Sequence, residues 1–445
     1  MLPLELPPMD LLAWIYPDKD ERELMSHFMC FGTIGMCAIP QVDKPIRFFD
    51  VAHHVKNPRG SSIVSDSLLL SLLAVAAVHR SAIFSQQGKG LISSQPVGKR
   101  GKPPMPPFTP TSNTIKRLKD IATHFSNSAI EMSRTAMVVK LSDDDSLSDH
   151  AVIYVLESLV SSLISQSMLG GTHWKDAFDI ALGIIRMKGG PERMLEMAKQ
   201  TSDEALTKIR ASLEDLAFVD TVVCLSTGIR PRLLVEPFQP WWFDYAPNNG
   251  RGAMNDFHYA YGLDRGLLEL ANRVNMLVYE RDILVSLSSR EHTAIHDTKV
   301  RDILLELVIW ESGIDQSKEL TRVEVGNIVM IHVIRVTIYV QLLQYPHSHP
   351  SVQSSALVGL RVLDNAEGFV MSLLVPKIIF GSVMLDTAGS ALALKTITCL
   401  RSTVTYCYDV EEAIRVVEQI YKDRDNGATD SDTNWHRYLG TALLL

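Results

Sequence analysis

The chain has 445 residues, of which 46% are hydrophobic and 21% are charged, and its formal net charge is −8 at pH 7. This is the composition of an ordinary globular protein, and the length suffices for one very large core or for two to three domains. The acidic balance excludes a protein-wide basic surface for DNA phosphates, so any contact with nucleic acid would need a local patch or a partner.

The first strong helical segment is SDSLLLSLLAVAAVHR, residues 65–80. Ser65 and Asp66 provide a cap signal, and the segment is apolar nearly all round, as expected of a central helix. A membrane-spanning helix needs roughly 20 apolar residues, whereas this apolar run is closed by His79 after about a dozen. We therefore predict a buried core helix and no membrane contact.

The segment THWKDAFDIALGIIRMKGGPE shows the clearest helical periodicity. Its apolar residues fall on one stripe at spacings of three and four, namely Trp174, Ala177, Phe178, Ala181, Ile184 and Ile185. Gly189 and Gly190 are natural stops at a helix C-terminus, and Pro191 suits the first position of the next helix.

The segment LLVPKIIFGSVMLD, residues 373–386, is almost entirely apolar but contains a proline and a glycine. Pro376 lacks an amide hydrogen and has a preset φ, so it suits the first turn of a new helix. Gly381 follows where a missing side chain would let another helix approach closely. We predict a tightly packed interior helix that begins near Pro376.

The remaining pattern is also helical. The segment 327–345 is rich in β-branched residues but runs too long for a strand, and we predict a buried helix there. Further helices are expected over about 20–36, 113–139, 148–169, 202–226, 262–289, 293–312, 353–371, 389–406 and 409–424. An exposed loop is expected over about 85–112, and a loop held down by aromatic residues over about 236–252. The prediction is one large all-α domain over residues 1–445, built of packed antiparallel helices without a significant β-sheet.

The candidate motif for a magnesium site is incomplete in this sequence. The acidic run Asp143–Asp145 with Asp149 lacks the spacing of a magnesium-binding diphosphate site, and Asn255 and Asp256 lack the following ligands. We interpret the run as a solvated acidic loop before a helix.

Two histidine pairs also fail as metal sites. His292 and His296 lack the glutamate between them that a zinc protease needs as its base, and we expect both on the surface. His347 and His349 are likewise expected to be exposed. The sequence predicts no catalytic, cofactor-binding or metal-binding residue, and no enzyme.

The cysteines and the basic residues carry little signal. The five cysteines are an odd number spread over the chain, so a disulfide framework is not expected, and surroundings such as those of Cys224 favour buried reduced thiols. The N-terminus has no secretory signal, which indicates an intracellular compartment. Lys99, Arg100 and Lys102 form a weak candidate import signal, although such clusters usually mean only solvation.

Several segments, taken in order, resemble the fungal-specific transcription factor domain, a regulatory region found downstream of a six-cysteine zinc cluster in many fungal activators. The segments are Glu21–Pro40, Ser65–Arg80, His173–Glu192, Tyr261–Leu277, Leu373–Asp386 and Trp435–Leu445. The most specific likeness is the proline, apolar triplet and glycine from Pro376 to Gly381. The family usually has tryptophan before that proline, where this chain has Val375.

The resemblance implies an all-α regulatory domain, a nuclear location, control of RNA polymerase II transcription, and partners that are other regulators or a second copy. In one branch of the family the domain binds a sterol. The zinc cluster is absent here, so we expect DNA to be reached only indirectly, through a partner or through a zinc cluster missing from the gene model. No other cofactor is expected. The alternatives are a sterol or lipid sensor with an apolar pocket among the C-terminal helices and, less favoured, a helical enzyme such as a terpene cyclase.

Overall fold

A computed structural model describes residues 11–32, 38–39, 49–91, 111–141, 149–171, 173–244, 256–287, 290–315, 317–366, 373–403, 405–440 and 442–444. Every regular element in these ranges is a helix and none is a strand, which confirms the all-α prediction. The first part of the chain forms α1 (Leu11–Ile15), α2 (Lys19–His27), α4 (Val51–Lys56), α5 (Ile63–Gly88), α6 (Ser112–Leu141), α7 (Asp149–Met168), α8 (Trp174–Met187), α9 (Pro191–Thr201) and α10 (Asp203–Thr227).

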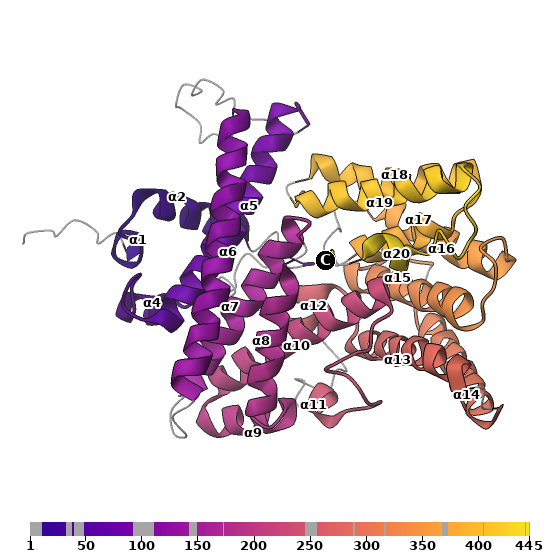
Figure 1. The fold of residues 1–445 in the computed structure, drawn as a ribbon, viewed down its shortest axis with the longest axis horizontal. Helices are drawn as coiled ribbons and strands as arrows, with labels where there is room; N and C mark the ends of the chain where they lie inside the picture. The colour runs from indigo at the N-terminus through magenta and orange to yellow at the C-terminus, as the bar shows by residue number, and fades with distance from the viewer. Residues whose placement is uncertain are drawn as a thin grey trace, which may run out of the picture.

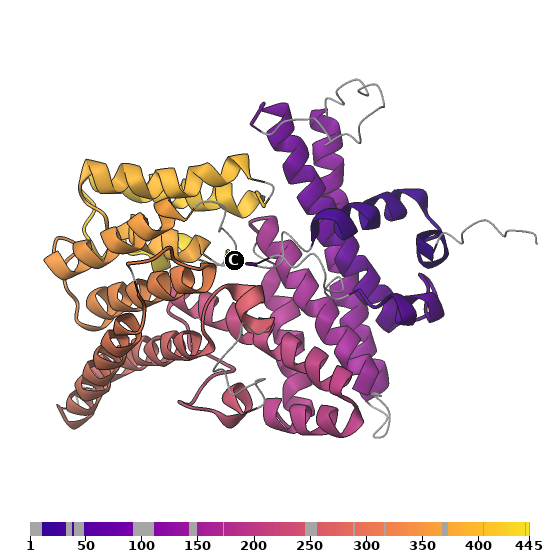
Figure 2. The same cartoon turned by 180° about the vertical axis from the view of Figure 1, so that it is seen from behind.

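The second part of the chain forms α11 (Pro240–Phe243), α12 (Asp256–Tyr261), α13 (Arg265–Leu287), α14 (Arg290–Ser312), α15 (Arg322–Thr337), α16 (Pro350–Asn365), α17 (Leu374–Val383), α18 (Thr387–Thr398), α19 (Tyr408–Asp425) and α20 (Trp435–Leu439). Helices α11 and α12 pack against α9 and α10, and the helices from α13 to α20 form a second group beside the first (Figure 1). The carboxyl end of the chain lies between the two groups, both in this view and in the view from behind (Figure 2).

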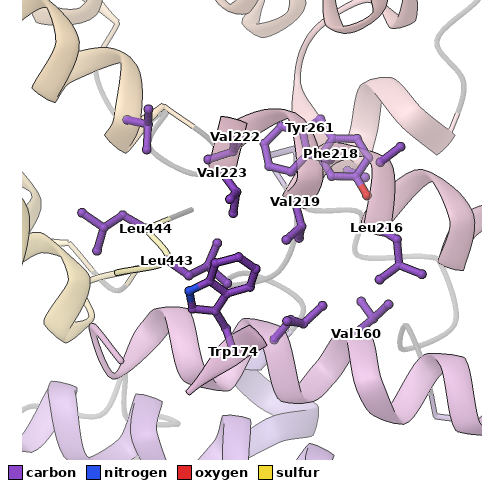
Figure 3. Close-up of a cluster of buried hydrophobic side chains, with 14 of the residues drawn as sticks. Val160, Trp174, Leu216, Phe218, Val219, Val222, Val223, Tyr261, Leu443 and Leu444 are labelled. Atoms are coloured by element: carbon purple, nitrogen blue, oxygen red, sulfur yellow. The ribbon is translucent and has the colours of Figure 1, made fainter. Parts of the chain in front are cut away.

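The final residues join the two groups through a shared apolar cluster (Figure 3). Leu443 and Leu444 are 1% exposed and lie beside Trp174 of α8 and the valines of α10. The indole Nε1 of Trp435 donates to the carbonyl of Leu225 at 2.9 Å. These residues belong to one contiguous apolar core that runs from Ile15 to Leu444.

Three helices are long and apolar enough to cross a membrane, namely Ile63–Gly88, Ala151–Met168 and Arg322–Leu342. Their most apolar windows are 83%, 89% and 78% buried inside the protein. Helix packing therefore already occupies most of their apolar surface.

Helix α5 is buried on nearly every side, as predicted, but it begins one turn earlier than its cap signal suggests. Ser62 occupies the N-cap position, and Ser65 and Asp66 lie inside the helix. Asp66 instead accepts a hydrogen bond from the amide of Gly60 at 2.7 Å, so its carboxylate holds the preceding turn.

The expected details of α8 and α9 are confirmed. All six residues of the predicted apolar stripe are buried. Gly189 and Gly190 have φ of +86° and +97°, a region that L side chains rarely adopt, and Pro191 is the first residue of α9. The segment 327–345 is helical as well, since α15 continues into a π-helical turn over Ile338–Leu342.

Helix α17 has the predicted interior character, since all ten of its residues are buried. Pro376 lies in its first turn. A Cβ atom added to Gly381 would come within 3.3 Å of Ala393 Cβ in α18 and 3.4 Å of Val417 in α19. The glycine therefore permits the close approach of two helices.

Several boundaries were predicted wrongly, and the helix expected over 353–371 runs instead over Pro350–Asn365. The single helix expected over 389–406 ends at Thr398 and is followed by a 3₁₀ turn, Cys399–Ser402, after which the backbone becomes extended at Thr403. The first residues of the loop expected over 85–112 belong instead to α5, which ends at Gly88. Residues 92–110 lie outside the described residues. The loop expected over 236–252 contains α11, whose Trp241 and Trp242 are buried, and residues 245–252 lie outside the described part.

Candidate functional site

The acidic residues considered as a magnesium site are not brought together in the described part of the chain. Residues 143–145 and Asn255 lie outside it, Asp149 begins α7, and Asp256 is exposed at the start of α12. Among the described residues there is no group of three or more histidine, cysteine or acidic side chains able to hold a metal ion.

Two histidines expected on the surface are in fact buried. His296 is 7% exposed, and its Nε2 lies 3.1 Å from the carbonyl oxygen of Leu277. His347 is 1% exposed and lies 3.0 Å from Nη2 of Arg424 and 3.4 Å from Asp430. Burial lowers the pKa of His347 to about 4. His296 is buried against the preceding helix, 19 residues away, and His347 against Arg424 and Asp430, 77 and 83 residues away, and helical spacing reports neither contact.

The cysteine prediction holds only in part. Cys224 and Cys407 are buried, and burial raises the pKa of each thiol well above its ordinary value. Cys30 and Cys399 are exposed. The four described cysteines are free thiols, and Cys37 lies outside the described residues.

A buried charged cluster lies where α10 crosses α13. One carboxylate oxygen of Glu214 accepts from Nε of Arg210 at 2.5 Å and from Nη1 of Arg265 at 2.6 Å. The three side chains are only 5–8% exposed. Arg210 also donates to the carbonyls of Trp241 and Trp242 in α11. The cluster thus ties α10, α11 and α13 together.

A second buried carboxylate on α10 holds the segment that follows the helix. Asp220 is fully buried and accepts from the amides of Arg232 and Leu233 at 2.6 and 3.0 Å. Burial raises the pKa of Asp220, and these hydrogen bonds oppose that rise. Nη1 of Arg232 also donates a hydrogen bond to Oδ1 of Asp179 in α8 at 2.9 Å. Both clusters hold helices and the segments that follow them in position.

The one charge inside α17 is different. Lys377 is 3% exposed, and no hydrogen bond or ion pair joins its Nζ to another described residue. Burial lowers its pKa to about 8, and the Cys399 thiol opposes this while the Arg322 cation adds to it. The sequence marks Lys377 as the lone charge of an apolar helix, but periodicity assigned it no role. Its ammonium is a candidate contact for an acceptor atom of a ligand.

A half-open hollow with a cavity volume of about 20 Å³, room for about one water molecule, lies between the end of α8 and helices α7, α9 and α10 and is lined by Val152, Lys188, Met194, Met197, Ala198 and Ile209. It is far smaller than the pockets that hold drug-sized ligands. It lies in the first group of helices, whereas the alternative reading as a sterol or lipid sensor expects a pocket among the C-terminal ones.

Among the described residues, α14 has more exposed large apolar side chains than any other helix. Leu305, Val308 and Ile309 are 64%, 55% and 70% exposed. Val300, Ile303 and Leu307, on the opposite side, are buried. The signal for this was present in the sequence, because VRDILLELVIW is apolar on more than one helical stripe, and a helix with one buried face needs only one.

Comparisons with known proteins support a whole-chain assignment. A family model described as the fungal specific transcription factor domain matches residues 23–444. Searches among curated proteins and among solved structures each found no significant match.

Proposed function

The chain belongs to the fungal-specific transcription factor domain family, and from that premise we propose that this transcriptional regulator acts in the nucleus on genes transcribed by RNA polymerase II. The match over residues 23–444 is the observation that carries the proposal. Because the match takes up nearly the whole chain, the regulatory activity belongs to the helical body itself.

The proposal further holds that another protein, or a zinc cluster outside this sequence, makes the contact with DNA. The net charge of −8 supports this, because a chain that neutralises several phosphates by itself usually carries a basic face. Buried clusters such as Arg210–Glu214–Arg265 use their arginines inside the fold, where they are not available to phosphates.

A tethering experiment tests the regulatory role. The full chain is fused to an unrelated DNA-binding domain, and transcription of a polymerase II reporter carrying its sites is measured together with the location of a fluorescent tag. We expect nuclear fluorescence and a changed reporter level. A fusion that is expressed and folded but leaves the reporter unchanged would contradict the proposal.

A gel-shift experiment tests the indirect contact with DNA. The purified chain alone is expected to give only weak, salt-sensitive shifts that do not depend on sequence. A tight sequence-specific shift by this chain alone would contradict the partner-dependent form.

Sensing of a hydrophobic ligand is a second candidate function, and Lys377 is the observation that favours it. A buried ammonium without a partner among the described residues would be stabilised by an acceptor group on an otherwise apolar molecule. A thermal-shift screen with sterols and lipids, repeated with Lys377→Met, tests this. A ligand that binds only the folded protein raises its melting temperature by mass action, so the absence of any shift at saturating concentrations would set the candidate aside.

A further inference from the structure

The apolar side of α14 is formed by residues that a helix of this geometry places together. At 100° per residue, Leu305, Val308 and Ile309 share one face, and the buried residues Val300 and Leu307 lie on the opposite face. The helix belongs to the α13–α14 pair, which extends away from the body of the protein (Figure 1). Its outer face is therefore open to another molecule.

These three side chains differ from singly exposed apolar residues, which are common on protein surfaces. They are adjacent on one helix face, and each is more than half exposed. Contiguous exposed apolar surface of this kind marks interaction sites. Covering it would remove apolar surface from water at roughly 25 cal/mol per Å².

We propose that this face, defined by Leu305, Val308 and Ile309, binds the same face of a second copy of the chain in an antiparallel arrangement. A two-fold axis near Val308 would place the three apolar side chains against their counterparts. An isologous contact of this type requires a self-complementary surface.

Charge complementarity argues for a second copy and for the antiparallel direction. Arg301 and Asp315 are both exposed, and they lie seven residues on either side of Val308. Seven residues correspond to about 10 Å along a helix. The hydrogen bonds Gly313 N to Ile309 O and Ile314 N to Glu311 O continue the turn beyond the end of α14, and they keep Asp315 near the helix end.

An antiparallel pair would therefore bring Arg301 of one copy to Asp315 of the other, twice by symmetry. A parallel pair would instead place Arg301 beside Arg301 and Asp315 beside Asp315, which is repulsive. The side chain of Asp315 is held by Ser317, whose amide and hydroxyl donate to its Oδ1 at 3.0 and 2.6 Å. The inference does not depend on the nuclear role proposed above.

Sedimentation of the purified full chain over a range of concentrations tests the surface. We expect a dimer for the natural chain and a monomer for Ile309→Glu. Ile295→Glu is the matched control, because Ile295 is 50% exposed on the same helix but lies 13 residues, about 20 Å, from Val308. It should leave the dimer intact. Circular dichroism melts establish that each variant is folded.

Charge exchange tests the register. Arg301→Asp alone and Asp315→Arg alone should each raise the dissociation constant by about tenfold, since each creates two like-charge contacts. An equimolar mixture of these two variants should regain the affinity, because both contacts in the mixed dimer pair opposite charges.

Two results would overturn the surface itself: a chain that is monomeric at every concentration reached, or a dimer that Ile309→Glu leaves unchanged. A dimer broken by Ile309→Glu but indifferent to charge exchange would overturn the antiparallel register. These measurements use purified protein and no reporter gene, so their failure is distinct from failure of the proposed regulatory function.

Discussion

Two regions of the molecule depart from the usual rule that charged side chains are exposed and apolar ones buried. Charged side chains are buried where α10 crosses α13, and apolar side chains are exposed on the outer face of α14. At the crossing, Arg210, Glu214 and Arg265 are 5–8% exposed. On α14, Leu305 and Ile309 are 64% and 70% exposed. Side-chain polarity alone therefore does not decide which residues are buried in this protein.

The difference lies in what each region contacts. The buried charges have partners in the fold, because Glu214 accepts from both arginines and Arg265 also lies over the rings of Trp242 and Phe257. The exposed side chains on α14 have no such cover from the part of the chain that the structure describes. A buried charge that is paired within the fold is tolerated, and an exposed apolar face is explained when a partner molecule covers it.

The largest effect is expected at the buried cluster. Glu214→Ala would leave two buried guanidinium groups without their shared carboxylate, and we expect it to lower the free energy of unfolding by about 3–5 kcal/mol. Urea denaturation followed by circular dichroism measures this. Glu204→Ala is the control on the same helix, because Glu204 is 71% exposed and pairs with Lys208, and its loss should be at most about 1 kcal/mol. Similar losses for the two variants would show that burial of the cluster is energetically unimportant.

The two faces of α14 provide the second test. Leu307 is fully buried and Leu305 is 64% exposed, so the same change to alanine is made at nearby positions. We expect Leu307→Ala to cost about 2–5 kcal/mol and Leu305→Ala less than about 0.5 kcal/mol. Denaturation is measured at protein concentrations low enough for the chain to be monomeric. A large loss for Leu305→Ala under those conditions would mean that its face is covered within one chain.

Lys377 allows a comparison with the paired buried charges, because it is a buried charge with no partner among the described residues. We expect Lys377→Met to raise the free energy of unfolding at pH 7 by about 2 kcal/mol, since it removes an uncompensated ammonium at similar side-chain length. Lys395→Met is the control, because Lys395 is 65% exposed and pairs with Asp364. That control should lose stability slightly or not at all, and a destabilised Lys377→Met would show that the ammonium has a stabilising contact.

The pH dependence of the same position is the smallest expected effect. The pKa of Lys377 is lowered by burial from 10.5 to about 8, so between these values the unfolded chain binds a proton that the folded chain does not. The Lys377 contribution to the free energy of unfolding therefore rises with pH from about 8 to 10.5 and is constant below that range. Denaturation curves across this range should show the advantage of Lys377→Met shrinking as pH increases. An advantage that stays constant would contradict the lowered pKa.

The sequence by itself was sufficient for the helices and for several of their details. The stripe of Trp174 and Phe178, the stop at Gly189–Gly190 and the position of Pro376 in the first turn of α17 follow from local rules of spacing, capping and backbone freedom. These rules involve residues within a few positions of each other, so one chain segment contains all the information. The family resemblance likewise rested on the order of such segments.

Tertiary structure alone decided which surfaces meet. His347 is buried because Arg424 and Asp430 come to it from 77 and 83 residues away, and Glu214 is paired because Arg265 approaches from 51 residues away. The outer face of α14 is exposed because the described chain uses only the opposite side of that helix for packing. Periodicity states that a helix has an apolar side, but the partner of that side depends on contacts between distant segments, which local spacing does not encode.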